Sequence, residues 1–440
     1  MMIGTFKGGI HPDDGKALSK SKPITLLEAG NELVFPVSQH IGAPATPIVK
    51  VGDSVLVGQI IAQATGFVSA NVVSSVSGKV KAIEGRLTVS GSKVMSIVVE
   101  NDKRYETVKG FGNARDYTKL TADEIRDIVK EAGIVGMGGA GFPTHVKLAP
   151  KDPEKIDTII VNGAECEPYL TSDYRVMKEA PQKIISGLKV MLSMFPSAKG
   201  FIGVEDNKPD CIRILAKMVE KENNIEVVSL KTKYPQGAER QLIYAVTGRK
   251  INASMLPADV GCIVDNVDTV VSIHNAVCES TPLIRRIITV TGDAICDPRN
   301  FEVRTGVPYS LLIESAGGFK KEPAKLISGG PMMGNAIYDI DIPVTKNSSA
   351  LLALSKDEVA GLEPSACIRC GKCVTACPSG LVPVKMYEYS THFDEEAFEK
   401  INGMECYECG CCTYVCPAKR PMTQAFRQTR RSIMAKRRKK

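Results

Sequence analysis

Eight cysteines near the C-terminus form two copies of one pattern. The copies are Cys367-x-x-Cys370-x-x-Cys373-x-x-x-Cys377-Pro378 and Cys406-x-x-Cys409-x-x-Cys412-x-x-x-Cys416-Pro417. Three thiolates spaced by two residues can hold three corners of one iron–sulfur cubane, and the cysteine before proline then reaches the other cluster. The spacing therefore predicts two [4Fe–4S] clusters with crossed ligands. One set is Cys367, Cys370, Cys373 and Cys416, and the other is Cys406, Cys409, Cys412 and Cys377.

A pair of zinc sites is the alternative, because zinc also binds four thiolates in CxxC-type motifs. The third cysteine of each copy and the Cys-Pro ending are not needed for zinc, but they match two-cluster ferredoxins. Cys411 interrupts the spacing and is not counted as a ligand. Two clusters would conduct single electrons, so a source and a sink for electrons are expected as well.

The densest glycine run of the chain extends from Gly133 to Lys147. Glycines allow backbone N–H groups to close on a phosphate or to lie flat under a ring, and Lys147 could add a positive charge. The run lacks the Gly-Lys-Ser/Thr ending of a Walker A loop, and it follows a predicted helix instead of the strand that precedes a Rossmann fingerprint. A flexible surface loop is the alternative.

A polar segment follows the predicted strand 157–161. It contains Asn162, Glu165 and Glu167, and Pro168 ends it. Polar groups directly after a parallel strand lie where α/β sheets bind ligands. Carboxylates there suit ribityl or ribose hydroxyls and the polar edges of a flavin or nicotinamide ring, whereas a solvated turn is the alternative.

The elements that must position these residues alternate between helices and strands from about residue 119. Thr121 and Glu124 form a capping box that opens an amphipathic helix. Strands and helices then alternate, which favours a parallel sheet covered by helices. The expected strands are 157–161, 200–204 and 225–230, and the expected helices are 209–221 and 238–246.

Two β-rich regions flank this α/β core. Residues 44–100 alternate β-branched runs with Gly-Asp turns and resemble the barrel-sandwich hybrid of biotinyl and lipoyl carriers, although 67–74 contains no lysine to acylate. Short strands broken by glycines at 285–340 predict a β-grasp module. The expected domains are 1–118 with the barrel-sandwich hybrid, 119–284 for FMN and NADH, 285–345 as an SLBB-like β-grasp module, 355–426 as a mainly helical two-cluster ferredoxin-like domain, and 427–440 as a basic tail.

The glycine loop and the segment Asn162–Pro168 resemble the flavin-binding subunit of respiratory NADH dehydrogenase. The chain is even more similar to the C subunit of Rnf complexes, the ion-translocating ferredoxin:NAD oxidoreductases. Three further segments carry this closer resemblance: Gly8–Pro12, Glu205–Pro209 and Tyr234–Gln241.

The resemblance implies two sets of site residues. FMN would contact Gly136, Gly138, Gly139, Gly141, Lys147, Asn162, Glu165, Gly237 and Asn266. NADH would contact Phe142, Glu167 and Glu239. Two positions depart from the dehydrogenase pattern, since Met137 replaces an arginine and Ala164 replaces an acidic residue. No side-chain acid or base is expected to act, because the flavin carries the chemistry.

The resemblance also implies a function and partners. Electrons would pass between NAD(H) and ferredoxin-linked partners through FMN and the two clusters, in contact with the other subunits of a membrane-bound Rnf-type complex. Two alternatives share parts of the pattern: a cobalamin reductase of propanediol-utilisation microcompartments, and a non-enzymatic electron carrier or scaffold. Zinc-dependent nucleic-acid binding is disfavoured, because the charge outside the C-terminal segment is balanced.

The charge distribution predicts where the chain works. The net charge of +7 equals the seven lysines and arginines of 430–440, so the rest is neutral. Such a segment is either a solvated tail or a contact for an acidic partner or anionic lipid. No apolar run reaches the roughly 18 residues of a membrane span, and Met1–Pro12 has no signal-peptide core. Fourteen cysteines then favour a reducing compartment. We therefore expect a peripheral protein on the cytoplasmic side of the membrane.

Overall fold

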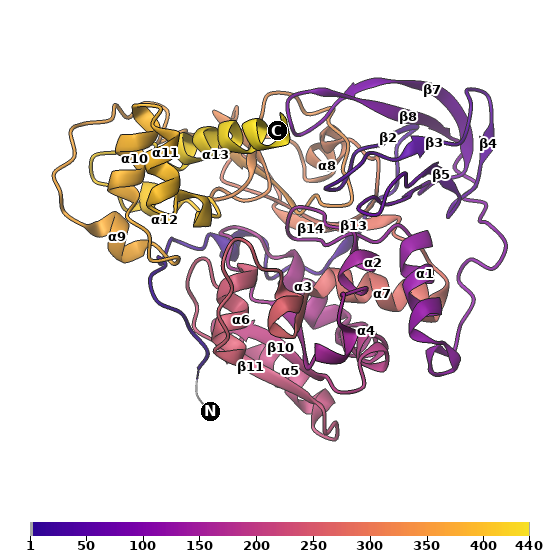
Figure 1. The fold of residues 1–440 in the computed structure, drawn as a ribbon. Coiled ribbons are helices and arrows are strands. Elements are labelled where there is room, and N and C mark those ends of the chain that lie inside the picture. The colour runs from indigo at the N-terminus through magenta and orange to yellow at the C-terminus, as the bar shows by residue number, and fades with distance from the viewer. Residues whose placement is uncertain (1–2, 440) are drawn as a thin grey trace.

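The computed structural model describes residues 3–439, in which the strands form four sheets (Figure 1). The central α/β domain has a parallel sheet of order β11-β10-β9-β12, as the alternation of elements predicts. Its strands are β9 (Thr158–Gly163), β10 (Lys199–Glu205), β11 (Ile225–Leu230) and β12 (Cys262–Asn266). Its helices are α1 (Ala122–Glu131), α2 (Thr144–Lys147), α3 (Ser172–Glu179), α4 (Pro181–Met194), α5 (Pro209–Val219), α6 (Glu239–Thr247) and α7 (Val267–Glu279).

The strand order creates a topological switch point. From β9 the chain moves outward to β10 and then to β11, and afterwards it returns to place β12 on the other side of β9. Helices that leave neighbouring strands in opposite directions open the carboxyl edge of a sheet to ligands at this point. The switch point therefore lies between the ends of β9 and β12.

Both faces of this sheet are buried, which explains the continuous apolar run of β9. Ile159 and Val161 belong to a core formed with α1, α4, α5 and α7. Ile160, between them, points to the opposite face and packs in a smaller core with residues of α6. Strands buried on both faces lack polar alternation.

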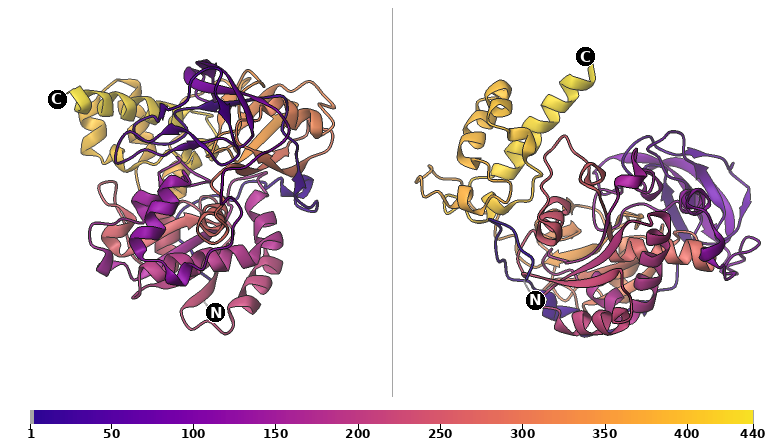
Figure 2. Two further views of the ribbon diagram at one scale, coloured as in Figure 1. Left: turned by 90° about the vertical axis from the view of Figure 1, so that its right-hand side faces the viewer. Right: turned by 60° about the horizontal axis from the view of Figure 1, so that its bottom comes forward.

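The N-terminal region forms the expected β-sandwich. One antiparallel sheet has the order β2-β8-β7-β4, with β2 (Glu32–Pro36), β4 (Ser54–Val55), β7 (Gly78–Leu87) and β8 (Lys93–Asn101). A second sheet has the order β3-β5-β6, with β3 (Thr46–Pro47), β5 (Ile60–Gln63) and β6 (Val72–Val73). Figure 2 shows this sandwich beside the β-grasp region, and the two share one hydrophobic core.

The β-grasp sheet extends past both predicted limits of its module. Its order is β1-β14-β13-β17-β15-β16, from β1 (Thr25–Leu26), β13 (Arg285–Thr291), β14 (Arg299–Arg304), β15 (Lys325–Ser328), β16 (Asn335–Ile337) and β17 (Ala350–Leu354), and it packs with α8 (Tyr309–Ser315). Strand β17 lies beyond residue 345, and β1 comes from the N-terminal region. These pairings join residues far apart in sequence, so local patterns do not reveal them.

The C-terminal domain is helical and contains α9 (Lys372–Ala376), α10 (Pro383–Thr391), α11 (Glu395–Lys400), α12 (Cys411–Tyr414) and α13 (Met422–Lys439). The domain also contains the short 3₁₀ helix Gly403–Glu405, and further 3₁₀ helices elsewhere are Lys16–Leu18, Tyr117–Lys119, Pro153–Lys155 and Pro257–Val260. No described helix of the chain is both long enough and apolar enough to cross a membrane.

The basic segment 427–440 differs from the expected tail. Helix α13 runs through residue 426 without a break, and Ile433 is buried in the core of the domain. Arg430 pairs with Glu408, and the ammonium of Lys436 lies 2.7 Å from the carboxylate of Glu395. Buried and paired side chains thus attach most of this basic segment to the domain, while Lys440 lies outside the described residues.

Candidate flavin and cluster sites

Two asparagines mark the switch point of the parallel sheet. Asn162 at the end of β9 and Asn266 at the end of β12 are partners in the strand register. Asn266 also caps α7, because its side-chain oxygen accepts from the N–H of Asp268 at 2.9 Å. Two of the residues expected to contact FMN therefore lie side by side where α/β sheets bind ligands.

The glycine loop closes over this switch point. The N–H of Gly136 donates to the carbonyl of Phe142 at 2.7 Å, which holds the two ends of the loop together. Gly138 has a left-handed backbone, and a Cβ atom there would lie 3.1 Å from the side-chain nitrogen of Asn266. Gly139 is exposed and has no atom within 4 Å of a Cβ position. Open backbone beside an asparagine amide fits a phosphate or a flat ring.

The other end of the loop packs against both β-rich modules. Gly141 is left-handed, and a Cβ there would lie 3.2 Å from the carbonyl of Gln39 and 3.5 Å from Cβ of Asn347. The N–H of Ile41 donates to the carbonyl of Gly141 at 3.3 Å. The barrel-sandwich and β-grasp modules therefore fix the position of the glycine loop.

Lys147 ends α2 and already has anionic partners. Its ammonium donates to the carbonyl of Val264 at 2.7 Å and lies 3.3 Å from Glu239 and 3.6 Å from Asp265. Burial opposes the charge of Lys147, but the attraction of Asp265 and Glu239 outweighs it and raises the pKa of the ammonium. The expected FMN and NADH contacts Lys147 and Glu239 are thus adjacent and paired with each other.

Gly237 completes the group around the asparagines. Its carbonyl accepts a hydrogen bond from the side-chain amide of Asn162 at 2.8 Å, and its N–H donates to Sγ of Cys166 at 3.2 Å. We define the candidate flavin site by four of the expected contacts that the structure brings together. They are Gly138, Asn162, Gly237 and Asn266.

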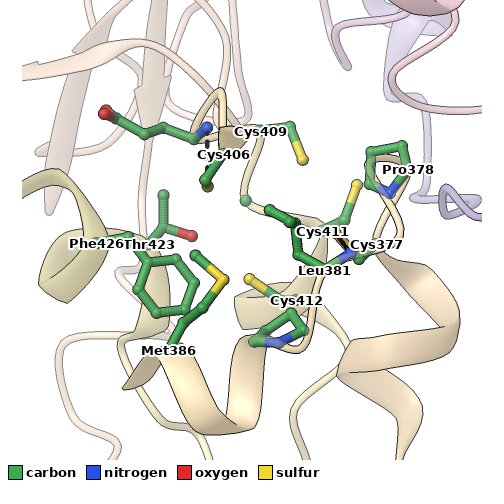
Figure 3. Close-up of a pocket in the computed structure, with 13 residues that line it drawn as sticks. Cys377, Pro378, Leu381, Met386, Cys406, Cys409, Cys411, Cys412, Thr423 and Phe426 are labelled. Atoms are coloured by element: carbon green, nitrogen blue, oxygen red, sulfur yellow. Dashed lines mark hydrogen bonds between the residues drawn. The ribbon is translucent and has the colours of Figure 1, made fainter. Parts of the chain in front are cut away.

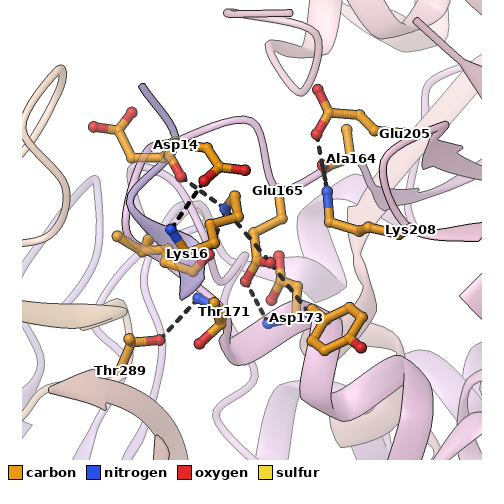
Figure 4. Close-up of polar contacts among 12 residues, drawn as sticks. Asp14, Lys16, Ala164, Glu165, Thr171, Asp173, Glu205, Lys208 and Thr289 are labelled. Carbon is orange, nitrogen blue, oxygen red and sulfur yellow. Dashed lines mark hydrogen bonds and ion pairs between the residues drawn. The ribbon is translucent and has the colours of Figure 1, made fainter. Parts of the chain in front are cut away.

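Glu165 belongs to a buried network of charges (Figure 4). Its carboxylate accepts from the N–H groups of Asp173 at 2.7 Å and Tyr174 at 3.3 Å, at the start of α3. The ammonium of Lys16 lies 3.7 Å away. Burial raises the pKa of the Glu165 carboxyl, although Lys16 and Lys208 act in the opposite direction. The acidic residue expected to contact FMN therefore holds the N-terminus of α3.

Glu167 is directed to the β-grasp module. Its Oε1 accepts from the N–H of Met332 at 2.7 Å and of Met333 at 3.2 Å, and a Cβ on Gly330 would collide with its side chain. Burial raises the pKa of this carboxyl. The structure thus gives Glu167 partners in the loop after β15, where we expected a contact with NADH.

Several polar groups near the candidate flavin site were not predicted from the sequence. Asp173 accepts from the amide of Asn266 at 2.6 Å, and burial together with the nearby Glu165 raises the pKa of Asp173 to about 7. Burial raises the pKa of Asp265 to about 6. The side-chain amide of Gln236 is buried and has no hydrogen-bond partner among residues 3–439. Asp265 could have been predicted as a site residue because it is acidic and directly precedes Asn266. No sequence pattern indicated that Asp173 and Gln236 lie near the site.

The eight repeated cysteines line two cavities in the C-terminal domain. One cavity, the Cys367 cavity, is lined by Cys367, Cys370, Cys373 and Cys416. The other, the Cys406 cavity, is lined by Cys377, Cys406, Cys409 and Cys412 and is shown in Figure 3. In each cavity three cysteines come from one copy of the repeat and the fourth from the other copy. This grouping is the one that crossed ligation requires.

The arrangement of the thiols suits a group larger than a single ion. No three His, Cys, Asp or Glu side chains of residues 3–439 are placed to hold one metal ion, whereas four of the eight repeated cysteines line each cavity. Cys411 also lines the Cys406 cavity, and its thiol lies 3.9 Å from the carbonyl of Tyr234. The thiol-lined cavities therefore fit two [4Fe–4S] clusters.

The fold and these sites define the chain as a flavin and iron–sulfur electron-transfer subunit. Family models match each part in turn. The Nuo51 FMN-binding domain matches residues 129–275, the RnfC barrel sandwich hybrid domain 4–104, the SLBB domain 287–336 and the 4Fe-4S dicluster domain 360–417. These matches confirm the predicted fold class and the FMN and [4Fe–4S] cofactors.

The chain belongs to the family of C subunits of ion-translocating ferredoxin:NAD⁺ oxidoreductase complexes. It is 48% identical to the C subunit of the Na⁺-translocating complex of Acetobacterium woodii, covering 99% of this chain and 98% of that protein. It is 48% identical to the C subunit of the proton-translocating complex of Clostridium ljungdahlii, over 87% of this chain and 83% of the relative. The corresponding C subunit of Rhodobacter capsulatus is 38% identical, with coverages of 96% and 82%.

A solved structure shows a similar fold. An NAD⁺-reducing [NiFe]-hydrogenase in its air-oxidised state aligns with a TM-score of 0.52 and 19% identity. The alignment covers 72% of this chain and 64% of the hydrogenase chain, so this protein spans less than two thirds of that chain.

Family membership confirms that the chain is an oxidoreductase subunit, which works with other subunits of a membrane-associated complex. It does not favour the cobalamin reductase or the scaffold alternative.

Proposed function

We propose that the chain passes electrons between NAD(H) and ferredoxin-linked partner subunits on the cytoplasmic side of the membrane. FMN at the candidate flavin site would supply the change between hydride transfer and single-electron transfer. Gly138, Asn162, Gly237 and Asn266 would hold FMN, and the Cys367 and Cys406 cavities would hold the clusters. Glu239 and Phe142 remain the proposed NADH contacts, while Glu165 and Glu167 position α3 and the loop after β15.

One observation carries this proposal: the Cys406 cavity adjoins the loop that also contributes Gly237 to the candidate flavin site. Tyr234 lies only three residues before Gly237, and its hydroxyl donates to the carbonyl of Cys409 at 2.7 Å. In the other cavity Cys367 and Cys370 are exposed. This supports an order in which the Cys406 cavity exchanges electrons with the flavin and the Cys367 cavity faces the partner.

The proposed compartment follows from the chemistry of the thiols. No pair of cysteines forms a disulfide within residues 3–439, and cluster ligation requires reduced thiols. NAD(H) must reach the flavin from the same side. Both requirements are met in the cytoplasm.

Cofactor analysis of anaerobically purified protein tests the proposal. We expect one FMN and about eight iron and eight sulfide per chain, and NADH should bleach the flavin. Zinc in place of iron, or protein without flavin under conditions that retain the clusters, would overturn it. Salt-dependent recovery of the chain with membranes, and its release by protease added to inverted but not to right-side-out vesicles, tests the proposed side.

A further inference from the structure

At one end, the loop between β11 and α6 contacts two residues that line the Cys406 cavity, Cys409 and Cys411. Tyr234 is among the largest fully buried side chains, with 1% of its surface exposed. Its hydroxyl donates to the carbonyl of Cys409, and its own carbonyl lies 3.9 Å from the thiol of Cys411. Ala376 and Cys411 pack against Tyr234 in one hydrophobic cluster. Tyr234 therefore holds Cys409 and Cys411, two residues that line the cavity, against the α/β domain.

The opposite end of the same loop belongs to the candidate flavin site. Gly237 accepts from the amide of Asn162 at 2.8 Å and donates to Cys166 at 3.2 Å. Cys166 also packs at the edge of the hydrophobic cluster around Tyr234. Two connections thus join the sites: the backbone from Tyr234 to Gly237, and the side chain of Cys166.

We propose that the Tyr234 segment, residues 234–237, is the bridge through which single electrons pass between the flavin site and the Cys406 cavity. In this role Tyr234 is a positioning residue that fixes the separation of the two sites. The proposal rests on the proposed function. When one electron passes from the flavin to the cluster, the flavin is oxidised by one electron and the cluster in the Cys406 cavity is reduced by one. The reverse holds for the opposite direction, and no atom moves along the segment.

The N-terminus of the chain holds this segment from a second side. Ile10 and Tyr234 exchange backbone hydrogen bonds of 2.8 and 2.9 Å, and the N–H of Gly9 donates to the carbonyl of Ala376 at 2.9 Å. A Cβ on Gly9 would lie 2.7 Å from the carbonyl of Tyr234. The close contacts matter because the rate of electron tunnelling falls exponentially with distance, so even a small displacement of Tyr234 slows transfer.

A second set of contacts joins the α/β domain to the C-terminal domain without involving residues 234–237. Arg240 on α6 lies 3.1 Å from Glu405, and the amide of Gln241 lies 3.1 Å from the hydroxyl of Tyr407. Arg240→Gln would weaken docking of the two domains but would leave the contacts of Tyr234 intact. It is therefore the matched control for changes at Tyr234.

The experiment compares the full-length holoprotein with Tyr234→Phe, Tyr234→Leu and Arg240→Gln. FMN, iron and sulfide are quantified first, and NADH is then mixed anaerobically in a single turnover. Flavin bleaching is followed by absorbance and cluster reduction by freeze-quench EPR. We expect unchanged flavin bleaching in every variant, several-fold slower cluster reduction in Tyr234→Phe, still slower reduction in Tyr234→Leu, and the wild-type rate in Arg240→Gln.

Amide hydrogen exchange provides a readout that does not depend on turnover. Exchange at Gln236 and Gly237 should rise in Tyr234→Phe and stay unchanged in Arg240→Gln. Wild-type cluster reduction in both Tyr234 variants, or equal slowing in Tyr234→Phe and Arg240→Gln, would overturn the bridge. If NADH fails to reduce the wild-type clusters, the proposed function itself is wrong, so the two failures are distinguishable.

Discussion

Asn162 and Asn266 are register partners at the carboxyl ends of β9 and β12, the two strands between which the parallel sheet reverses its order. This relationship places the candidate flavin site at the switch point and brings the glycine loop, the end of β9 and the start of α7 together. Asn266 connects all three, because it pairs with Asn162 of β9 in the strand register, caps α7 and faces Gly138.

Replacing Asn266 should weaken binding and stability to different extents. Asn266→Ser keeps a side-chain oxygen for the cap of α7 but lacks the amide that faces Gly138 and donates to Asp173, so FMN affinity should fall and the lost bond to Asp173 should cost about 1–3 kcal/mol of unfolding free energy. Asn266→Ala removes the cap as well and should cost about 1 kcal/mol more. FMN titration of cofactor-free protein and chemical denaturation measure the two effects. Equal FMN affinity in wild type and Asn266→Ala would show that the flavin binds elsewhere.

Crossed ligation makes one cysteine of the first repeat essential to the second cluster. Cys377 lines the cavity of Cys406, Cys409 and Cys412, so Cys377→Ala should remove or alter the cluster in that cavity. The cluster in the Cys367 cavity should persist. EPR of the reduced protein and iron content provide the measurement, and Cys296→Ala, at an exposed cysteine outside the repeat, is the control. Loss of the signal from the Cys367 cavity alone would contradict crossing.

The stability of the cofactor-free protein should fall as pH rises through neutrality. The folded-state pKa of Asp173 is about 7, above the unfolded value, because burial and Glu165 disfavour its charge, with Asp268 acting in the same direction and Arg286 against it. Such a carboxyl stabilises the fold fully below its unfolded pKa of about 4, and the contribution is lost as pH rises through about 7. Asp173→Asn should flatten the dependence of the unfolding midpoint on pH between about pH 4 and pH 7, the interval between the unfolded and folded pKa values. A slope unchanged by Asp173→Asn would refute the assignment.

Glu167 offers a test of its two possible roles. Its carboxylate oxygen accepts from two backbone N–H groups, of which that of Met332 is half-buried and that of Met333 exposed, so Glu167→Ala should destabilise the protein by about 1 kcal/mol. Glu167→Gln retains an acceptor oxygen and should cost much less. Denaturation and the KM for NADH are measured together. A KM raised strongly by Glu167→Gln, at unchanged stability, would return Glu167 to the NADH site.

The basic helix α13 combines a structural face with a charged one. Ile433 is buried, so Ile433→Ala should destabilise the cluster domain by about 2–4 kcal/mol, as other large-to-small core changes do. Arg431 and Arg438 are exposed, and Arg431→Gln with Arg438→Gln should weaken membrane retention at low salt only. Dye reduction by NADH should remain. Loss of dye reduction in the arginine double variant would mean that these charges serve the fold.

Sequence patterns predicted the parts of this protein that depend on neighbouring residues. The Thr121–Glu124 capping box is present as expected, since its four residues determine it. The two cysteine sets could be predicted because covalent spacing limits which thiols reach one cluster. The repeat also carried enough chemistry to indicate the cofactor before any fold was known.

Patterns failed where distant segments meet. Strand β17 joins β13 and β15 in the middle of a sheet, and the ammonium of Lys16 reaches Glu165 from a segment nearly 150 positions earlier in the chain. Neither pairing leaves a local signal. The roles of Glu165 and Glu167 were therefore predicted from the loop that contains them, and the distant residues that they contact could not be predicted. The basic segment was misleading for the same reason, because its anionic partners Glu395 and Glu408 precede it on other elements.

We expect electrons from NADH to reach the clusters only through the flavin. Anaerobic protein with and without FMN, each with its clusters intact, is compared after addition of NADH. NADH should reduce the clusters in the FMN-loaded protein, as seen by EPR, and leave them oxidised in the FMN-free protein until FMN is restored. Cluster reduction at the same rate in both samples, or bleached flavin beside clusters that dithionite but not NADH can reduce, would contradict it.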